Sequence, residues 1–311
     1  MRLCAPKIMA FFIEVLISGL MAGVLYSLVA LGFVLIFKAS GVFNFAQGAM
    51  VLFAALTFVR LIEILSETFA PILLALAITI VVMILLAIVI ERLVLRPLVN
   101  QPGISLFMAT LGIAYFLDGF GQALWGSDVY VLDIGIPKDS MFILESVFEG
   151  GILVSSEDLV ATLIAGVLVA TLAIFFQRTR IGRALRAVAD DHQAAQSVGI
   201  PLNYIWVVVW SVAGLVALVA GAVWGSKLGV QFSLSLIALK ALPVLILGGF
   251  ESVVGAIVGG LIIGAGEKIS EIYLGPLIGG GIENWFAYVL ALLFLVFRPQ
   301  GLFGEKHIDR V

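Results

Sequence analysis

The sequence predicts an all-α, polytopic transmembrane helical bundle with about eight or nine membrane segments. Apolar residues make up 62% of the 311 residues without glycine, and charged residues only 12%. Soluble domains have about 45–50% apolar residues with glycine included, and roughly a quarter charged. The apolar runs approach the roughly 20 residues that cross a bilayer. They lack the alternation of a membrane β-barrel, so the spanning units are expected to be helices.

Nine apolar runs are candidate crossings. In chain order they are Phe11–Phe37, Ala46–Leu65, Pro71–Ile90, Ile104–Leu124, Leu159–Phe176, Ile205–Trp224, Leu234–Leu247, Val253–Ala265 and Trp285–Phe297. Some are too short to be simple spans, which predicts interrupted helices. The first run is too long for a cleavable signal peptide and is expected to be retained. We therefore expect one transmembrane domain over residues 1–311.

The charges predict the sides of the loops. Seven acids and only Lys138 lie between Gly126 and Asp158, whereas four arginines and no acid lie between Arg178 and Arg186. Since cytoplasmic loops collect Lys and Arg, residues 179–201 are expected in the cytoplasm, with the C-terminus, and residues 125–158 outside. Nine crossings would place the N-terminus outside, against the preference of its basic residues. A re-entrant run would reverse this, and both topologies remain open.

The sequence contains no recognisable catalytic or metal constellation. Cys4 is the only cysteine, and His192 and His307 are too unlike in context to form one site, so neither metal nor cofactor is expected. The stretch "GLIIGAGEKIS" does not match a phosphate-binding loop. Any ATP hydrolysis is therefore expected in a separate subunit, and an enzyme is the weakest interpretation.

Small residues recur at four-residue spacing in two runs, which predicts close helix contacts in the membrane. They are Gly19, Gly23 and Ser27 in the first run, and Gly255, Gly259, Gly260 and Gly264 in the eighth, where Ile263 continues the spacing of Gly255 and Gly259.

Polar interruptions of the apolar runs are candidates for a translocation pathway. The stretch Lys38–Ala49 places Asn44 and Gln47 between two apolar runs, and a later short run holds Lys240 with Pro243. Irregular backbone at membrane depth is tolerated when it is buried in protein or lines a wet cavity. A short interfacial turn is the alternative interpretation of the first stretch. Asp118 also interrupts an apolar run, either facing a cavity or approaching the outer interface.

The stretch Thr179–Pro201 predicts a short amphipathic helix from Arg183 to Val198, ended by Gly199. Its apolar stripe comprises Leu185, Val188, Ala189, His192, Ala195 and Val198. Because that stripe is mostly Ala and Val, and Asp190 and Asp191 would repel anionic lipid, docking to a protein is favoured over lying on lipid.

Five motifs in order resemble the permease subunit of bacterial branched-chain amino acid ABC importers. They are "FNFAQG", "ERLVLRPL", "GRALRAVADDHQAAQSVGI", "LKALPVLILGG" and "RPQGLFG". The resemblance covers nearly the whole chain. It implies a second, similar permease, two ATP-binding subunits, an extracytoplasmic binding protein and a bacterial inner-membrane location, with no nucleic acid partner.

The resemblance makes Thr179–Pro201 a coupling helix seated in a groove of the ATPase. The residues expected to carry this contact are Arg183, Leu185, Arg186, Val188, Asp190, Asp191 and Ala195. We expect the apolar members to pack in the groove and Arg186 and the aspartates to form pairs at its rim.

The substrate is expected to be a branched-chain or other apolar amino acid. Family members commonly read N-F-A-H-G-E where this chain has Asn44 to Ala49, so an amide and a methyl replace an imidazole and a carboxylate. Gln47 also suits urea or a short amide, and this alternative remains open. A stand-alone secondary transporter or channel is the other alternative, with Asp118 and Lys240 as candidate intramembrane charges.

Overall fold

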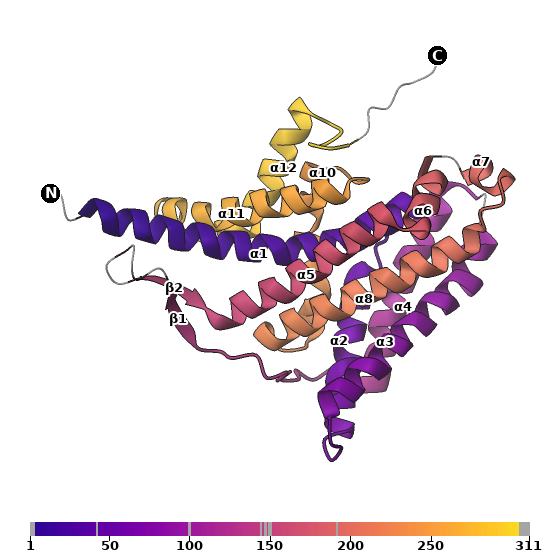
Figure 1. Ribbon diagram of the computed structural model, residues 1–311, viewed down its shortest axis with the longest axis horizontal. Coiled ribbons are helices and arrows are strands. Elements are labelled where there is room, and N and C mark those ends of the chain that lie inside the picture. Colours follow the sequence, from indigo (N-terminus) through magenta and orange to yellow (C-terminus); the bar gives the residue numbers. More distant parts are fainter. Residues whose placement is uncertain are drawn as a thin grey trace. The chain divides into compact units, whose positions relative to one another are not determined.

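The computed structural model describes residues 4–41, 43–98, 101–143, 145, 148, 151–190 and 192–304. Its α-helices are α1 (Cys4–Ser40), α2 (Gln47–Ile64), α3 (Pro71–Ile90), α4 (Gly103–Trp125), α5 (Ser156–Arg178), α6 (Arg180–Asp190), α7 (His192–Ser197), α8 (Leu202–Leu228), α9 (Ile237–Lys240), α10 (Leu242–Gly248), α11 (Val253–Ile278) and α12 (Phe286–Phe297) (Figure 1). A π-helical turn, Glu91–Leu95, and three 3-10 segments, Arg96–Leu98, Phe232–Leu236 and Ile282–Asn284, complete the helical structure. Strands β1 (Ser140–Ile143) and β2 (Ile152–Ser155) form an antiparallel pair, with Ser140 opposite Ser155.

The structure confirms an all-α, polytopic membrane protein. Seven helical segments in the described chain are long and apolar enough to cross a membrane. They are Met9–Ser40, Gln47–Ile64, Pro71–Leu98, Gly103–Trp125, Ser156–Arg178, Leu202–Leu228 and Val253–Ile278. Two shorter apolar segments, Phe232–Gly248 and Phe286–Phe297, account for the remaining predicted runs.

Two of the predicted runs differ in detail from the structure. The seventh is divided into a 3-10 segment, α9 and α10, with Pro243 in the first turn of α10, where its missing N–H has no helical partner to lose. The eighth continues beyond Ala265 to Ile278 and so carries charged residues inside the helix. Ion pairing and backbone hydrogen bonds, described below, accommodate those charges.

The chain forms two compact units. Unit 1 comprises residues 1–30, 135–167 and 240–311, and unit 2 comprises residues 31–134 and 168–239. In unit 2, α2 contacts α3, α4 and α8. A side chain at Gly221 of α8 would collide with the carbonyl oxygen of Val51, 2.7 Å from an ideal Cβ. The glycine therefore permits the close approach of α8 to α2.

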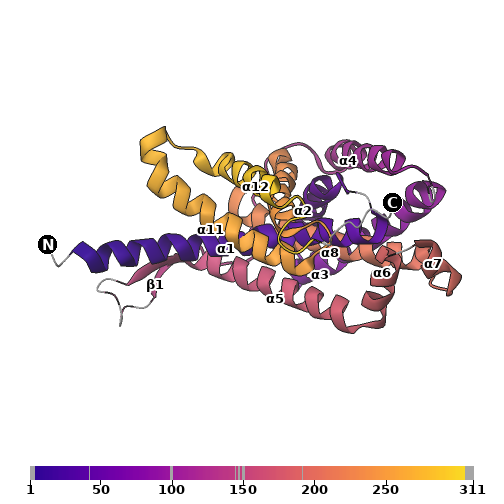
Figure 2. The same ribbon diagram turned by 90° about the horizontal axis from the view of Figure 1, so that it is seen from above.

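Unit 1 is built on a glycine crossing between α1 and α11, which lie side by side (Figures 1 and 2). A Cβ at Gly19 would lie 2.8 Å from the carbonyl oxygen of Gly264, and one at Gly23 would lie 2.9 Å from the Cα of Leu261. Ser27 donates to the carbonyl oxygen of Gly23 at 2.8 Å and lies 3.2 Å from that of Ile257. The close helix contacts predicted from small residues are thus confirmed.

Two motifs of the sequence interlock at the end of α10. Leu302 N donates to Leu247 O at 2.8 Å, and Phe303 N donates to Gly248 O at 3.1 Å. Gly249 and Gly301 have φ of 103° and 79°, which glycine adopts readily, and a Cβ on Gly301 would lie 2.7 Å from Gly249 N. The "RPQGLFG" stretch is therefore held against the end of "LKALPVLILGG".

Candidate functional site

The polar break between α1 and α2 brings Asn44 and Gln47 together. Both residues are fully buried. Asn44 Oδ1 accepts a hydrogen bond from Ala46 N at 3.0 Å, and Asn44 Nδ2 lies 3.5 Å from Gln47 Oε1. The Asn44 side chain therefore stabilises the turn before α2 by accepting a backbone hydrogen bond, and this ability favours Asn in turns and caps.

The Gln47 side chain fills a notch inside unit 2. Gln47 Nε2 donates to Ala213 O of α8 at 3.4 Å. An ideal Cβ at Gly32 would overlap the Gln47 amide, so the absence of a side chain at Gly32 makes room for it. Both polar groups of the Gln47 side chain therefore have partners within the protein. Irregular backbone at membrane depth is tolerated when it is buried in protein or lines a wet cavity, and at Gln47 the break is buried in protein.

Thr110 of α4 ties both sides of the break to the bundle. Its Oγ1 accepts from Phe45 N at 3.3 Å and lies 3.3 Å from Phe43 O and 2.9 Å from Phe107 O. The rings of Phe43, Phe45 and Phe107 form consecutive edge-to-face contacts with centroids 4.6 and 4.9 Å apart. The break is therefore fixed by packing as well as by hydrogen bonds.

Asp118 lies eight residues beyond Thr110 on the same helix, α4, which is about 12 Å at the α-helical rise. The residue is half-buried, and its enclosed Oδ1 has no hydrogen-bond partner among the described residues. Asp118 is thus not part of the cluster formed by Asn44 and Gln47. An unpaired carboxylate oxygen within a span remains a candidate for a further partner.

Lys240 ends α9 and belongs to unit 1, whereas the other three predicted pathway residues belong to unit 2. Its ammonium interacts electrostatically with Glu267 of α11, a residue only 2% exposed. Glu267 also has a side-chain hydrogen bond with Tyr26 of α1. Inside unit 1, Glu267 of α11 therefore has a hydrogen bond with α1 and an electrostatic interaction with the interrupted segment.

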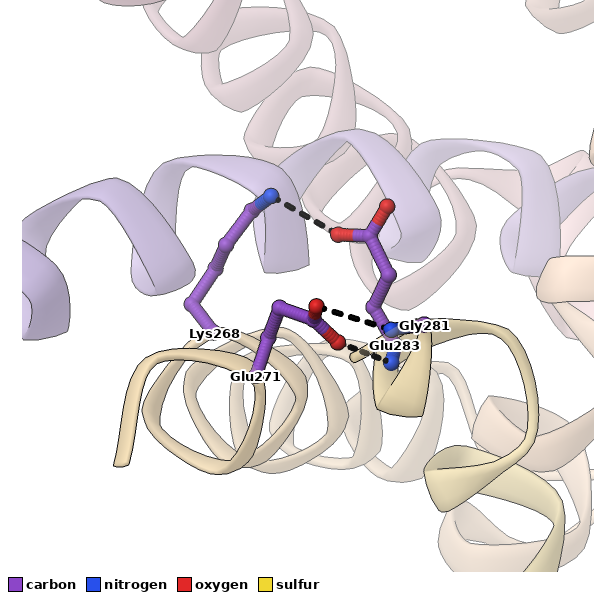
Figure 3. Close-up of polar contacts among 4 residues, drawn as sticks. All are labelled: Lys268, Glu271, Gly281 and Glu283. Atoms are coloured by element: carbon purple, nitrogen blue, oxygen red, sulfur yellow. Dashed lines mark hydrogen bonds and ion pairs between the residues drawn. The ribbon is translucent and has the colours of Figure 1, made fainter. Parts of the chain in front are cut away.

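A second polar cluster lies where α11 turns into α12 (Figure 3). Lys268 Nζ forms an ion pair with Glu283 Oε2 at 3.0 Å. The Glu271 carboxylate accepts from Gly281 N at 3.0 Å and from Glu283 N at 2.9 Å, as Figure 3 shows. This cluster and the contacts of Glu267 are not predicted from the sequence. Charged residues directly after an apolar run were the available signal, because ionisable residues within a membrane span often mark functional sites.

The segment predicted to couple to an ATPase begins with a tight joint between α5 and α6. Thr179 Oγ1 accepts from Gly182 N at 3.1 Å, as an N-cap does. Arg186 Nη1 donates to Phe176 O at 2.6 Å and so satisfies a carbonyl at the end of α5. A Cβ at Gly182 would overlap the Phe176 backbone. Arg186, expected to pair at a partner's rim, is therefore engaged within the chain.

The apolar stripe of this segment faces its own chain. Leu185, Val188 and Ala195 are 2%, 0% and 3% exposed, and α6 and α7 both contact α8. These three side chains, which are expected from the sequence in an ATPase groove, are therefore buried within this chain, and their direct contact with an ATPase stays a prediction. Val198, expected on the same stripe, is 76% exposed.

The structure has two helices, α6 and α7, where the sequence predicts one from Arg183 to Val198. Arg183 and Asp190 are exposed on α6, and Asp191 lies outside the described residues. The exposed polar side chains, rather than the apolar stripe, are thus the part of α6 available to another protein.

The chain is similar to known proteins over nearly its whole length. The profile of the family described as "Branched-chain amino acid transport system / permease component" matches residues 15–298. A high-affinity branched-chain amino acid transport system permease protein, BraD of Pseudomonas aeruginosa, is 26% identical over 96% of this chain and 98% of its own. The corresponding LivH of Salmonella typhimurium is 25% identical over 97% and 98%. A probable LivH of Methanocaldococcus jannaschii is 29% identical over 89% and 88%. No solved structure matches the chain.

Proposed function

Because the chain belongs to the family of permease components of branched-chain amino acid transport systems, we propose that it is the membrane-spanning subunit of an ATP-driven importer. Its cargo is a branched-chain or other apolar amino acid. The observation that carries this proposal is the near full-length similarity to permeases named for that transport, together with seven candidate spans. Hydrolysis of ATP takes place in separate subunits.

The assembled importer contains a second homologous permease, two ATP-binding subunits and an extracytoplasmic binding protein, in a bacterial inner membrane. Residues 179–201 and the C-terminus face the cytoplasm, and residues 125–158 face outward. The exposed face of α4 supports a contact with the second permease. Nothing lies within 4 Å of an ideal Cβ at Gly112 or Gly119, and Asp118 is on the same helix. Uncovered glycines favour close approach of another membrane helix.

The coupling segment acts through two sets of residues. Arg183, Asp190 and Asp191 contact the ATPase. Leu185, Val188, Arg186 and Ala195 position that surface, since the structure buries the three apolar residues and bonds Arg186 to the end of α5. A movement of the ATPase is then transmitted to α8 and α5 through packed contacts.

A reconstitution in liposomes tests the proposed function. The purified chain alone is expected to show no leucine uptake, and the chain with its partner subunits and binding protein is expected to show ATP-dependent uptake. The mass of the complex checks for two permease chains and two ATP-binding chains. Uptake by the chain alone, driven by an ion gradient, would establish a secondary transporter instead.

The pathway residues are proposed to act at two levels. Asp118 and Lys240 lie along the route, while Asn44 and Gln47 hold the break in shape beside it. Gln47→Leu is expected to lower the transport rate while the complex still assembles, because Asn44 loses a buried partner at a cost of about 1–3 kcal/mol. The measurement is uptake and ATPase activity of the purified complex. The control is Gln101→Leu at an exposed position.

Unchanged uptake of every amino acid tested, or failure of Gln47→Leu to assemble, would mean that the break is a structural turn only. The internal hydrogen bonds of Gln47 also weaken the argument that this residue recognises urea or a short amide as cargo. Because that amide already donates to Ala213 O, the residue-level reason for preferring a neutral amide cargo no longer applies.

A further inference from the structure

A groove in unit 1 is lined by residues of α1, the β1–β2 hairpin and the start of α5. Its volume is about 240 Å³, and its lining includes the carboxylates of Glu14 and Asp158 and the hydroxyls of Ser18, Ser140 and Ser155. This is room for about eight water molecules at roughly 30 Å³ each. The groove is therefore large enough for one long side chain.

The groove is firmly built. Met21 of α1 forms a buried apolar cluster with Ile152 and Val154 of β2. Glu14 Oε2 accepts a hydrogen bond from Leu153 N at 3.2 Å, which ties the hairpin to α1. Asp158 N donates to Ser155 Oγ at 3.3 Å at the beginning of α5. The two acidic residues that line the groove thus come from different elements, Glu14 from α1 and Asp158 from α5.

The lining has one sign of charge. Glu14 and Asp158 are half-buried, and no Lys, Arg or His is among the described residues that line the groove. The apolar wall, which includes Val15 and Met21, runs beside these acids. A Lys or Arg side chain has the matching form, because its aliphatic stem covers apolar surface while its charged head meets carboxylates. A zwitterionic amino acid would bring a further carboxylate into a space that already holds two.

We propose that this groove receives a lysine or arginine side chain of the extracytoplasmic binding protein. This inference rests on the proposed function, which supplies the partner and places residues 125–158 outside. The sequence supports the charge complementarity, since the segment from Gly126 to Asp158 carries seven acids and one base. Complementary charges of this kind raise association rates and specify the partner.

The test measures association of the binding protein of this transport system with the detergent-solubilised complete importer. The variant is Glu14→Gln with Asp158→Asn, which removes both negative charges, keeps the size of both side chains and leaves each one oxygen as a hydrogen-bond acceptor. We expect association to weaken about tenfold or more, with a reduced dependence on salt. Asp128→Asn is the matched control, since Asp128 is an exposed acid of the same segment that does not line the groove. Its association should remain near that of the unchanged importer.

A second measurement uses n-butylammonium chloride as a competitor, with tetramethylammonium chloride at equal ionic strength as its control. The primary ammonium is expected to weaken association with the unchanged importer, whether or not the double variant can be purified. Undiminished association in the double variant, equal losses in the double variant and in Asp128→Asn, or no competition by n-butylammonium would each overturn the proposal. Failure of the binding protein to associate with the unchanged importer would instead contradict the proposed function as well.

Discussion

Val188→Asp is expected to abolish coupled ATP hydrolysis and transport. Val188 is completely buried on α6, which contacts α8. A carboxylate there would have to be accommodated without a partner, at a cost of about 3–5 kcal/mol for an uncompensated buried charge. We expect α6 to detach from α8, so that the exposed residues of the coupling segment are no longer held in place. Substrate-stimulated ATPase activity of the reconstituted importer measures this loss.

Val198→Asp is the matched control, because Val198 follows α7 and is 76% exposed. The same substitution there places the charge in water and should leave assembly intact. A second measurement separates packing within the chain from packing against the ATPase. The thermal midpoint of the purified permease alone should fall for Val188→Asp. An unchanged midpoint together with lost ATPase binding would show that Val188 contacts the ATPase directly. Normal coupling in Val188→Asp would refute both assignments.

The sequence predicts an amphipathic segment here, but it does not tell what covers the apolar stripe. Hydrophobic periodicity reports that one face avoids water, and that face can pack on another protein or on the same chain. The burial of Leu185 and Ala195 depends on the joint at Gly182, which turns the chain back so that α6 and α7 contact α8. That turn is a tertiary feature, and hydropathy contains no information about it.

The helices themselves were largely predictable because their length and apolarity are set by the bilayer. The predicted runs Pro71–Ile90 and Trp285–Phe297 match α3 and α12 within one residue. The end of α11 was not predictable in the same way. Glu267, Lys268 and Glu271 seemed to end an apolar run, yet each has a polar partner from another part of unit 1. Pairing of distant residues extends the helix beyond the limit that hydropathy suggests.

The hydrogen-bond partners of the predicted pathway residues are likewise not predictable from hydropathy. The sequence shows that Asn44 and Gln47 interrupt an apolar region, and the structure confirms a non-helical break there. One hydrogen-bond partner of Gln47, Ala213 O, comes from α8, more than a hundred residues away. The room for the Gln47 amide depends on the absence of a side chain at Gly32. Composition therefore identifies the polar residues, while their hydrogen-bond partners depend on the fold.

Gly264→Leu is expected to prevent unit 1 from assembling, with the largest loss of stability among the substitutions considered. The nearest neighbours of a Cβ at Gly264 are the Gly19 carbonyl oxygen and the Gly23 backbone nitrogen and Cα, all of them backbone atoms of α1. A flexible side chain could move aside, but a helix backbone cannot do so without separating α1 from α11. Adding volume to a well-packed core costs about 1–3 kcal/mol when side chains can adjust, and this crossing allows no such adjustment. The measurement is the yield and thermal midpoint of the purified permease.

Gly166→Leu is the matched control for this crossing, since the nearest atom to a Cβ at Gly166 of α5 is a Val24 methyl carbon at 4.0 Å. The two substitutions add the same side chain to a glycine in a candidate span, so their propensity and lipid-solubility effects are alike. A difference between them therefore measures the backbone contact alone. Because lipid offers no hydrophobic force between helices, a separated α1 and α11 have little to bring them back together. Equal stability of the two variants would show that the glycine crossing does not hold unit 1.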